Sequence, residues 1–159
     1  MRKIYLVVVF MTLLFSWGVQ AQSREGDVQV GSGIGMTFNP PVRFDFDLSG
    51  NYFYSDELSI GFDFDVLIRH GAVYGLVPFV RYHFDLPKAR RIDPYVGGGM
   101  GLQIASSGST AFDLMAPNLG FDYELTPHLY IGPDVSIHLL VGRSTDWDLH
   151  AIGRIGYRF

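Results

Sequence analysis

The sequence contains no cysteine and little lysine, and these shortages limit how the protein can be stabilised and what it can bind. Without cysteine the chain can form no disulfide bond and no thiolate metal site, so its stability must have another source. Acidic residues outnumber basic ones, 16 to 12, so there is no excess of positive charge to bind a nucleic acid. Lys88 is the only lysine after residue 21, and the remaining cations are arginines, which suit paired and poorly solvated positions.

Long apolar runs are also scarce, and the longest lies at the N-terminus. Arg2 and Lys3 precede an apolar stretch of about 12 residues, and the small-residue motif Val19-Gln20-Ala21 follows it. A helical span needs about 20 apolar residues, so we expect residues 1–21 to be a cleaved signal peptide for the Sec pathway. Residues 22–159 would then form one domain with ten cations, sixteen anions and a net charge of −6. No later segment is apolar for long enough to predict a helical span.

Motifs typical of common enzymes and metal sites are missing. There is no Gly-x-Ser-x-Gly segment and no His-x-His pair, and no helix is expected after Gly97-Gly98-Gly99 that would complete a phosphate site. Asp134, Ser136 and His138 share one face of a predicted strand, but positions two residues apart on a strand are separated by about 7 Å. That spacing is too long for the hydrogen-bonded relay of a catalytic triad. We therefore expect no catalytic residues, no metal site and no cofactor.

The chain is instead rich in alternating apolar and polar residues, which is the period of a β-strand. Val42, Phe44 and Phe46 fall on one face of such a segment, whereas Asp45 and Asp47 fall on the other. Turn-forming residues separate the alternating stretches from one another. This pattern predicts eight strands, at residues 27–38, 42–54, 58–69, 73–85, 94–105, 112–125, 129–141 and 147–159.

Alternation alone does not show which face of a barrel points outward. A transmembrane barrel turns its apolar face to lipid, whereas a soluble, lipocalin-like ligand-binding barrel in the periplasm turns it inward. Eight strands enclose an interior that side chains only just fill, and here the polar face carries glycines such as Gly33 while the apolar face carries large residues such as Phe44. Aromatic residues near strand ends, including Tyr52, Tyr95 and Trp147, fit the girdles of a membrane barrel. We therefore expect an all-β, eight-stranded antiparallel up-and-down transmembrane barrel with a polar lumen, and the soluble barrel is the alternative.

Three parts of the sequence resemble the small eight-stranded outer-membrane β-barrel families. They are residues 94–101, residues 123–132 and the alternating end at residues 151–159. The resemblance implies a place in the cell outer membrane, in contact with its lipid and lipopolysaccharide. It also implies assembly by the barrel-assembly machinery, which would read Tyr157 and Phe159 in the last strand. The predicted connections between strands are shorter than those of adhesive members, and we expect a monomer.

Charged side chains of both signs fall on the polar face of the predicted strands. We expect them to fill the lumen with a network of ion pairs, because an unpaired charge there is costly. A register for the last two strands that places Asp134 opposite Arg154 also places His138 opposite His150. The candidate lumen residues are Arg43, Asp45, Asp47, Asp63, Asp65, Arg81, Asp134, His138, His150 and Arg154.

A lumen of this kind fits two functions, a structural barrel with a filled interior or a narrow, porin-like channel. Four carboxylates, those of Asp45, Asp47, Asp63 and Asp65, cluster on adjacent predicted strands, which would suit small solutes or cations in a channel. A barrel enzyme that modifies lipid A is the less favoured third possibility, because the sequence has no His-x-Ser motif.

Overall fold

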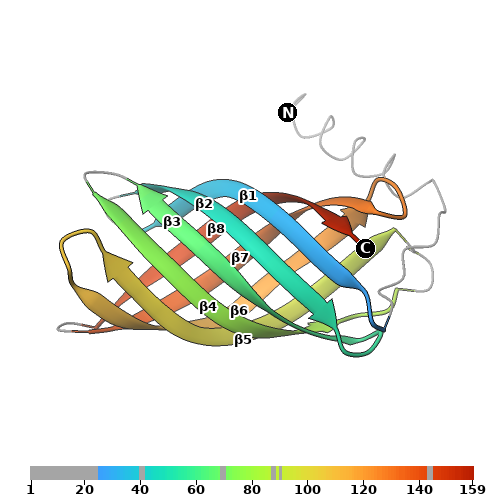
Figure 1. Ribbon diagram of the computed structural model, residues 1–159, viewed down its shortest axis with the longest axis horizontal. Coiled ribbons are helices and arrows are strands. Elements are labelled where there is room, and N and C mark those ends of the chain that lie inside the picture. The colour runs from blue at the N-terminus through green and yellow to red at the C-terminus, as the bar shows by residue number, and fades with distance from the viewer. Residues whose placement is uncertain (1–24, 40–41, 69–70, 87–88, 90, 143–144) are drawn as a thin grey trace, which may run out of the picture.

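The computed structural model of the chain is a closed barrel of eight antiparallel strands (Figure 1). The strands are β1 (Val28–Phe38), β2 (Arg43–Phe53), β3 (Leu58–Ile68), β4 (Ala72–His83), β5 (Ile92–Ala105), β6 (Thr110–Glu124), β7 (Leu129–Val141) and β8 (Thr145–Arg158). Every predicted strand is confirmed, with bounds that differ by at most two residues. The structure describes residues 25–39, 42–68, 71–86, 89, 91–142 and 145–159, so the predicted signal peptide lies outside the described residues.

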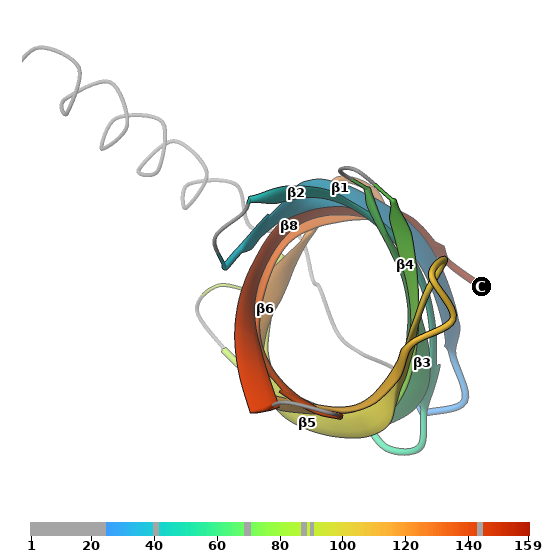
Figure 2. The same ribbon diagram turned by 90° about the vertical axis from the view of Figure 1, so that its left-hand side faces the viewer.

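The barrel closes because β1 pairs with β8 as well as with β2. Gln29 lies opposite Arg158 and Phe38 lies opposite Leu149, so this pairing runs along almost all of β1. Seen end-on, the strands form a complete ring (Figure 2). A closed sheet leaves no strand edge unpaired, as lipid requires of β-structure. Within the described part of the chain, no helix is long and apolar enough to cross a membrane.

The two ends of the barrel are distinguished by the chain termini. β1 begins and β8 ends at one of them, and we call this the terminal end. The other end, where β1 ends and β2 begins, is called the far end.

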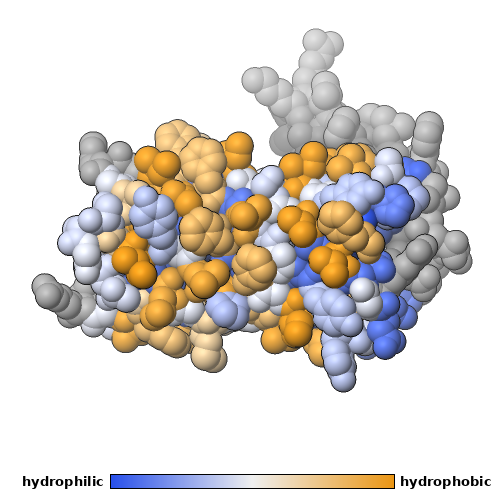
Figure 3. All heavy atoms as spheres, viewed as in Figure 1, coloured by the Kyte–Doolittle hydropathy of each residue, from blue (hydrophilic) through white to orange (hydrophobic). Residues whose placement is uncertain are grey.

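The strands place apolar side chains on the outer wall and polar side chains in the lumen. Phe44 and Leu102 are 60% and 51% exposed, whereas Asp45 and Asp113 are fully buried. Apolar residues cover much of the visible wall between the two ends (Figure 3). This is the arrangement of a transmembrane barrel, since lipid accepts large side chains outside while the narrow interior holds the polar ones. A soluble ligand-binding barrel needs the reverse arrangement.

The predicted register of the last two strands is wrong by two residues. Asp134 lies opposite Ile152 rather than Arg154, and His138 lies opposite Asp148 rather than His150. The hairpin between β7 and β8 is tighter than predicted, since its strands already pair at Val141 and Thr145. A shift of two residues keeps every side chain on the same face, so the lumen residues still point inward.

Two further features depart from simple alternation. Tyr95 was predicted in an aromatic girdle but is buried in the lumen, where a Cβ atom at position 120 would lie 2.6 Å from its ring. Gly120 therefore leaves the space that this ring occupies. In β6 the pairing shifts between Met115 and Asn118, and both side chains are buried although they are three positions apart, which in a regular strand would place them on opposite faces. This irregularity reverses the inward-facing parity and turns Asp113 into the lumen.

Candidate functional site in the lumen

The middle of the lumen is crossed by one ion-pair network, which we call the central cluster: Asp47, Asp63, Arg81, Asp134 and Arg154. Arg154 on β8 contacts three carboxylates that come from three other strands. Its Nε lies 3.2 Å from Asp47 Oδ1, its Nη2 lies 3.2 Å from Asp63 Oδ1, and its Nη1 lies 3.2 Å from Asp134 Oδ2. The guanidinium thus links β2, β3 and β7 across the barrel.

Arg81 on β4 joins the same cluster from the other side. Its Nη2 donates to Asp63 Oδ2 at 3.2 Å and lies 3.4 Å from Asp134 Oδ2, and its Nε donates to Asn118 Oδ1 at 2.7 Å. Asp134 also accepts hydrogen bonds from Asn118 Nδ2 at 2.7 Å and from the Tyr95 hydroxyl at 2.6 Å. These hydrogen bonds satisfy Asp134 and Asn118 and rigidify this side of the cluster, whereas the Asp47 carboxylate makes its described contact with Arg154 as an ion pair without hydrogen-bond geometry.

The terminal end of the lumen holds a second group of polar side chains. Arg158 Nη1 donates to Glu124 Oε1 at 2.7 Å, and Arg158 Nη2 lies 3.7 Å from Asp93 Oδ2. His83 Nδ1 lies 3.1 Å from the Asp93 carboxylate, and its Nε2 shares a hydrogen bond of 2.9 Å with Ser59 Oγ. These contacts form a Ser–His–Asp relay inside the wall.

The far half of the lumen holds a third group, which we call the far-end cluster: Arg43, Asp45, Asp65, Asp113, His138, Asp148 and His150. Arg43 Nη1 lies 3.5 Å from Asp148 Oδ2, and His150 Nδ1 lies 2.8 Å from Asp45 Oδ2. The rings of His138 and His150 stack with their centroids 4.0 Å apart. The mouth above the cluster is a cavity of about 420 Å³, whose lining includes Arg43 and Gln103.

A second Ser–His–Asp relay lies in the far half, contrary to the expectation from strand spacing. Ser136 Oγ and His138 Nε2 lie 3.0 Å apart, and His138 Nδ1 lies 3.0 Å from the carboxylate of Asp113. The prediction that Ser136 and His138 are too far apart was wrong, because the long imidazole side chain leans along the strand and spans the separation between the two positions. The acid in the relay is Asp113 rather than Asp134.

The structure describes all ten of the predicted lumen residues, and it separates them into two clusters. Arg81 and Arg154 meet three aspartates in the central cluster, while the other five lie in the far-end cluster. Arg43 differs from the rest because it lies at the mouth, with its side chain 27% exposed. Inward-facing groups that the sequence did not single out include Gln29, Ser59, Asp93, Tyr95, Gln103, Asp113, Tyr130 and Asp148.

The predicted assembly residues lie on the outer wall at the terminal end. Tyr157 is 45% exposed and Phe159 is 69% exposed, and their rings meet edge-on with centroids 4.8 Å apart. The backbone N–H of Phe159 donates to the carbonyl of Val28 at 2.8 Å, so the last residue still contributes to barrel closure. Both aromatic side chains are therefore available to another molecule.

No protein-family model and no curated protein sequence matches the chain. Solved structures do match it. The N-terminal β-barrel domain of Pseudomonas aeruginosa OprF shares 18% identity at a TM-score of 0.63, covering 85% of this chain and 98% of that one. Neisserial surface protein A shares 17% identity at a TM-score of 0.63, covering 83% and 94%. The outer membrane enzyme PagL shares 13% identity at a TM-score of 0.55, covering 82% and 98%.

Identities this low establish a common fold and nothing finer. Together with the closed sheet, the apolar wall and the charged lumen, they define the class of the protein. The chain is a small, eight-stranded transmembrane β-barrel of the outer-membrane type.

Proposed function

We propose that the protein is a structural outer-membrane barrel whose lumen is closed, rather than a porin. The observation that carries this proposal is the contact of Arg154 with three aspartates from three strands at the middle of the lumen. Val77, Phe79 and Met115 form a buried apolar cluster in the same lumen, which further fills the interior. Water or solute would have to break these contacts to pass.

The energetic reason for closure is the cost of leaving a buried charge without its partner. Removing one member of a buried ion pair costs about 3–5 kcal/mol. Arg154 and Arg81 share Asp63 and Asp134, whereas Asp47, among the described residues, contacts Arg154 alone. Moving Arg154 aside would therefore leave Asp47 without its cation and place two carboxylates on Arg81. Opening a path past Arg154 therefore requires that side chain to leave three buried carboxylates at once.

The proposal extends to the setting in which the barrel works. The apolar wall would lie in the lipid and lipopolysaccharide of the outer membrane after export by the Sec pathway, with the protein as a monomer. Tyr157 and Phe159 would serve as the signal that the barrel-assembly machinery reads. Their exposure on the outer wall supports this role, because a recognition signal has to be accessible.

The two Ser–His–Asp relays favour a structural rather than a catalytic role in this proposal. Ser59 and Ser136 are 0% and 3% exposed, and both face the lumen rather than the lipid. The same arrangement occurs in both halves of the barrel, as expected of a way to satisfy buried histidines. In each relay the carboxylate fixes the orientation of the imidazole, and the serine hydroxyl shares a hydrogen bond with the other ring nitrogen.

A liposome-swelling assay tests the closed lumen. Vesicles containing the refolded barrel should exclude a pentose as well as empty vesicles do. The matched variants are Arg154→Ala, which removes the residue that bridges three strands, and Arg43→Ala, which removes an arginine at the mouth. Rapid swelling with the unmodified protein, at a rate proportional to the amount of barrel, would contradict the proposal and favour the porin-like channel.

A further inference from the structure

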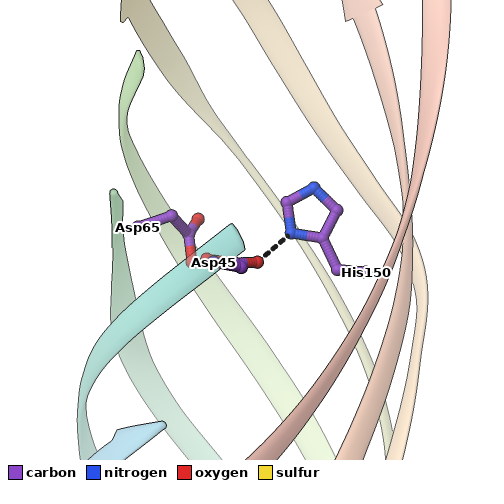
Figure 4. Close-up of side chains that lie close together, drawn as sticks. All are labelled: Asp45, Asp65 and His150. Atoms are coloured by element: carbon purple, nitrogen blue, oxygen red, sulfur yellow. Dashed lines mark ion pairs between the residues drawn. The ribbon is translucent and has the colours of Figure 1, made fainter. Parts of the chain in front are cut away.

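Three buried side chains in the far-end cluster converge from strands that are distant in sequence. They are Asp45 on β2, Asp65 on β3 and His150 on β8 (Figure 4). One ligand-type atom from each lies within 4.8 Å of the other two. The exposed fractions of the three residues are 0%, 3% and 1%, so bulk water does not surround them.

These side chains lack the hydrogen bonds that buried polar groups normally make. Among the described residues, Asp65 Oδ2 and His150 Nε2 have no hydrogen-bond partner. His150 Nδ1 lies 2.8 Å from Asp45 Oδ2, the ion-pair contact drawn as a dashed line in Figure 4. This contact does not have the geometry of a hydrogen bond. When the His150 ring is neutral with its proton on Nε2, Nδ1 and Asp45 Oδ2 are two electron-pair donors that face each other, and a cation bound to both would stabilise them.

The negative charge around these three side chains also favours a bound cation. The described part of the far-end cluster has four carboxylates, on Asp45, Asp65, Asp113 and Asp148, and one arginine. That arginine, Arg43, is directed to Asp148 at the mouth. Buried carboxylates are costly unless they are paired or coordinate a metal, so a dication would stabilise this half of the lumen.

We propose that Asp45, Asp65 and His150 form a binding site for a divalent transition-metal ion of the zinc class. Imidazole nitrogen combined with carboxylate oxygen suits such ions, and three protein ligands leave at least one position for water. Calcium and magnesium prefer ligand sets made of oxygen alone.

The neighbouring residues supply the support that a metal site requires. His138 stacks on the His150 ring at 4.0 Å, and Asp113 holds His138 in place through Nδ1 at 3.0 Å. Gln103 in turn donates to Asp113 at 2.9 Å. Such outer contacts fix the orientation of a ligand ring. The cavity of about 420 Å³ at the far end is lined in part by Arg43 and by Gln103, the residue that donates to Asp113, and the three ligands lie deeper in the lumen than its lining.

The site is tested by titrating zinc into the refolded barrel and measuring the binding by isothermal titration calorimetry. The background carries His70→Asn and His128→Asn, so that neither of these two histidines can bind zinc. We expect saturable binding of one zinc ion per chain. Asp65→Asn and His150→Gln should each weaken binding by about tenfold or more. The matched control is His83→Gln, which alters a buried histidine in the other half of the lumen and should leave the affinity unchanged.

Heat-modifiable gel mobility identifies the variants that refold, and Co²⁺ provides a second readout. The unmodified barrel should develop visible absorption bands with Co²⁺ that Asp65→Asn or His150→Gln alters and His83→Gln does not. Absence of saturable zinc binding would overturn the proposal, as would equal binding by every folded variant. Tighter binding of Ca²⁺ than of Zn²⁺ would overturn the assignment to a transition metal.

Discussion

The guanidinium of Arg154 lies 3.2 Å from the carboxylate of Asp134, although the two residues do not face each other across the β7–β8 ladder. Gly132 lies opposite Arg154, so the long arginine side chain reaches diagonally to the next inward-facing position of β7. The same diagonal brings His138 against His150, although Ser136 is the residue paired with His150. The lumen contacts therefore depend on side-chain reach as well as on backbone register.

Removal of the bridging arginine should destabilise the barrel. Arg154→Ala leaves Asp47, Asp63 and Asp134 with less compensation, and the expected loss is about 3–5 kcal/mol in the free energy of unfolding. Urea unfolding in lipid vesicles measures it. Arg43→Ala is the control, because that arginine is partly exposed and, among the described residues, pairs with a single carboxylate, that of Asp148, at 3.5 Å. Equal losses in the two variants would show that the central cluster has no special role.

A charge on the outer wall should be costly in proportion to its depth in the membrane. Phe46→Arg and Leu102→Arg are each expected to lower the free energy of unfolding in vesicles by about 2–4 kcal/mol if these positions lie near the midplane. Ser107→Arg, in the exposed far-end loop between β5 and β6, should have little effect. Tolerance of all three changes would refute the assignment of the apolar wall to lipid.

Deletion of Phe159 should impair assembly in cells but not folding in detergent. The exposed ring packs edge-on against Tyr157, and the backbone N–H donates one hydrogen bond to Val28, so the deletion removes one of many bonds that close the barrel and little packing. We expect a smaller protease-resistant, membrane-inserted fraction in cells, and nearly unchanged refolding of the purified chain. Phe84→Ala changes another exposed aromatic residue just after β4 and serves as the control. Normal assembly of the deletion would exclude the signal role, and failure to refold in detergent would indicate a packing role instead.

The buried serines should be unreactive. A fluorophosphonate probe, which labels activated serines, is expected to leave Ser136 unmodified, because the residue is 3% exposed and faces the lumen. Mass spectrometry of the refolded barrel provides the measurement. Labelling at Ser136 that disappears in His138→Gln, without comparable labelling at Ser59, would instead support a catalytic relay.

Much of the fold could be predicted, because the alternation of apolar and polar residues indicates both where the strands lie and which side chains point into the lumen. The register could not be predicted, because a slip of two residues between β7 and β8 leaves every side chain on the same face of the sheet. Asp113 escaped notice because the irregularity between Met115 and Asn118 changes which positions of β6 point inward. Side-chain length also mattered, since His138 reaches Ser136 along the strand.

The proposed metal site shows a further limit of sequence patterns. Residues 45, 65 and 150 have no ligand spacing along the chain, and the expectation of no metal site was based on such spacing. The three residues meet because β1, pairing with both β2 and β8, brings those two strands close together in a narrow barrel. Only the closed structure places them side by side.

Single-channel recording in a planar bilayer tests the central claim most directly. The claim is that Arg154 and its three aspartates close the lumen, so the unmodified barrel should show no long-lived conducting state at either polarity. Folded protein, identified by its heat-modifiable mobility, would be used together with Arg43→Ala as the matched variant. Brief and rare openings that become longer or more frequent in Arg154→Ala, but not in Arg43→Ala, are the predicted result. Steady, cation-selective conductance by the unmodified barrel, unaffected by substitution of Arg154, would contradict the account.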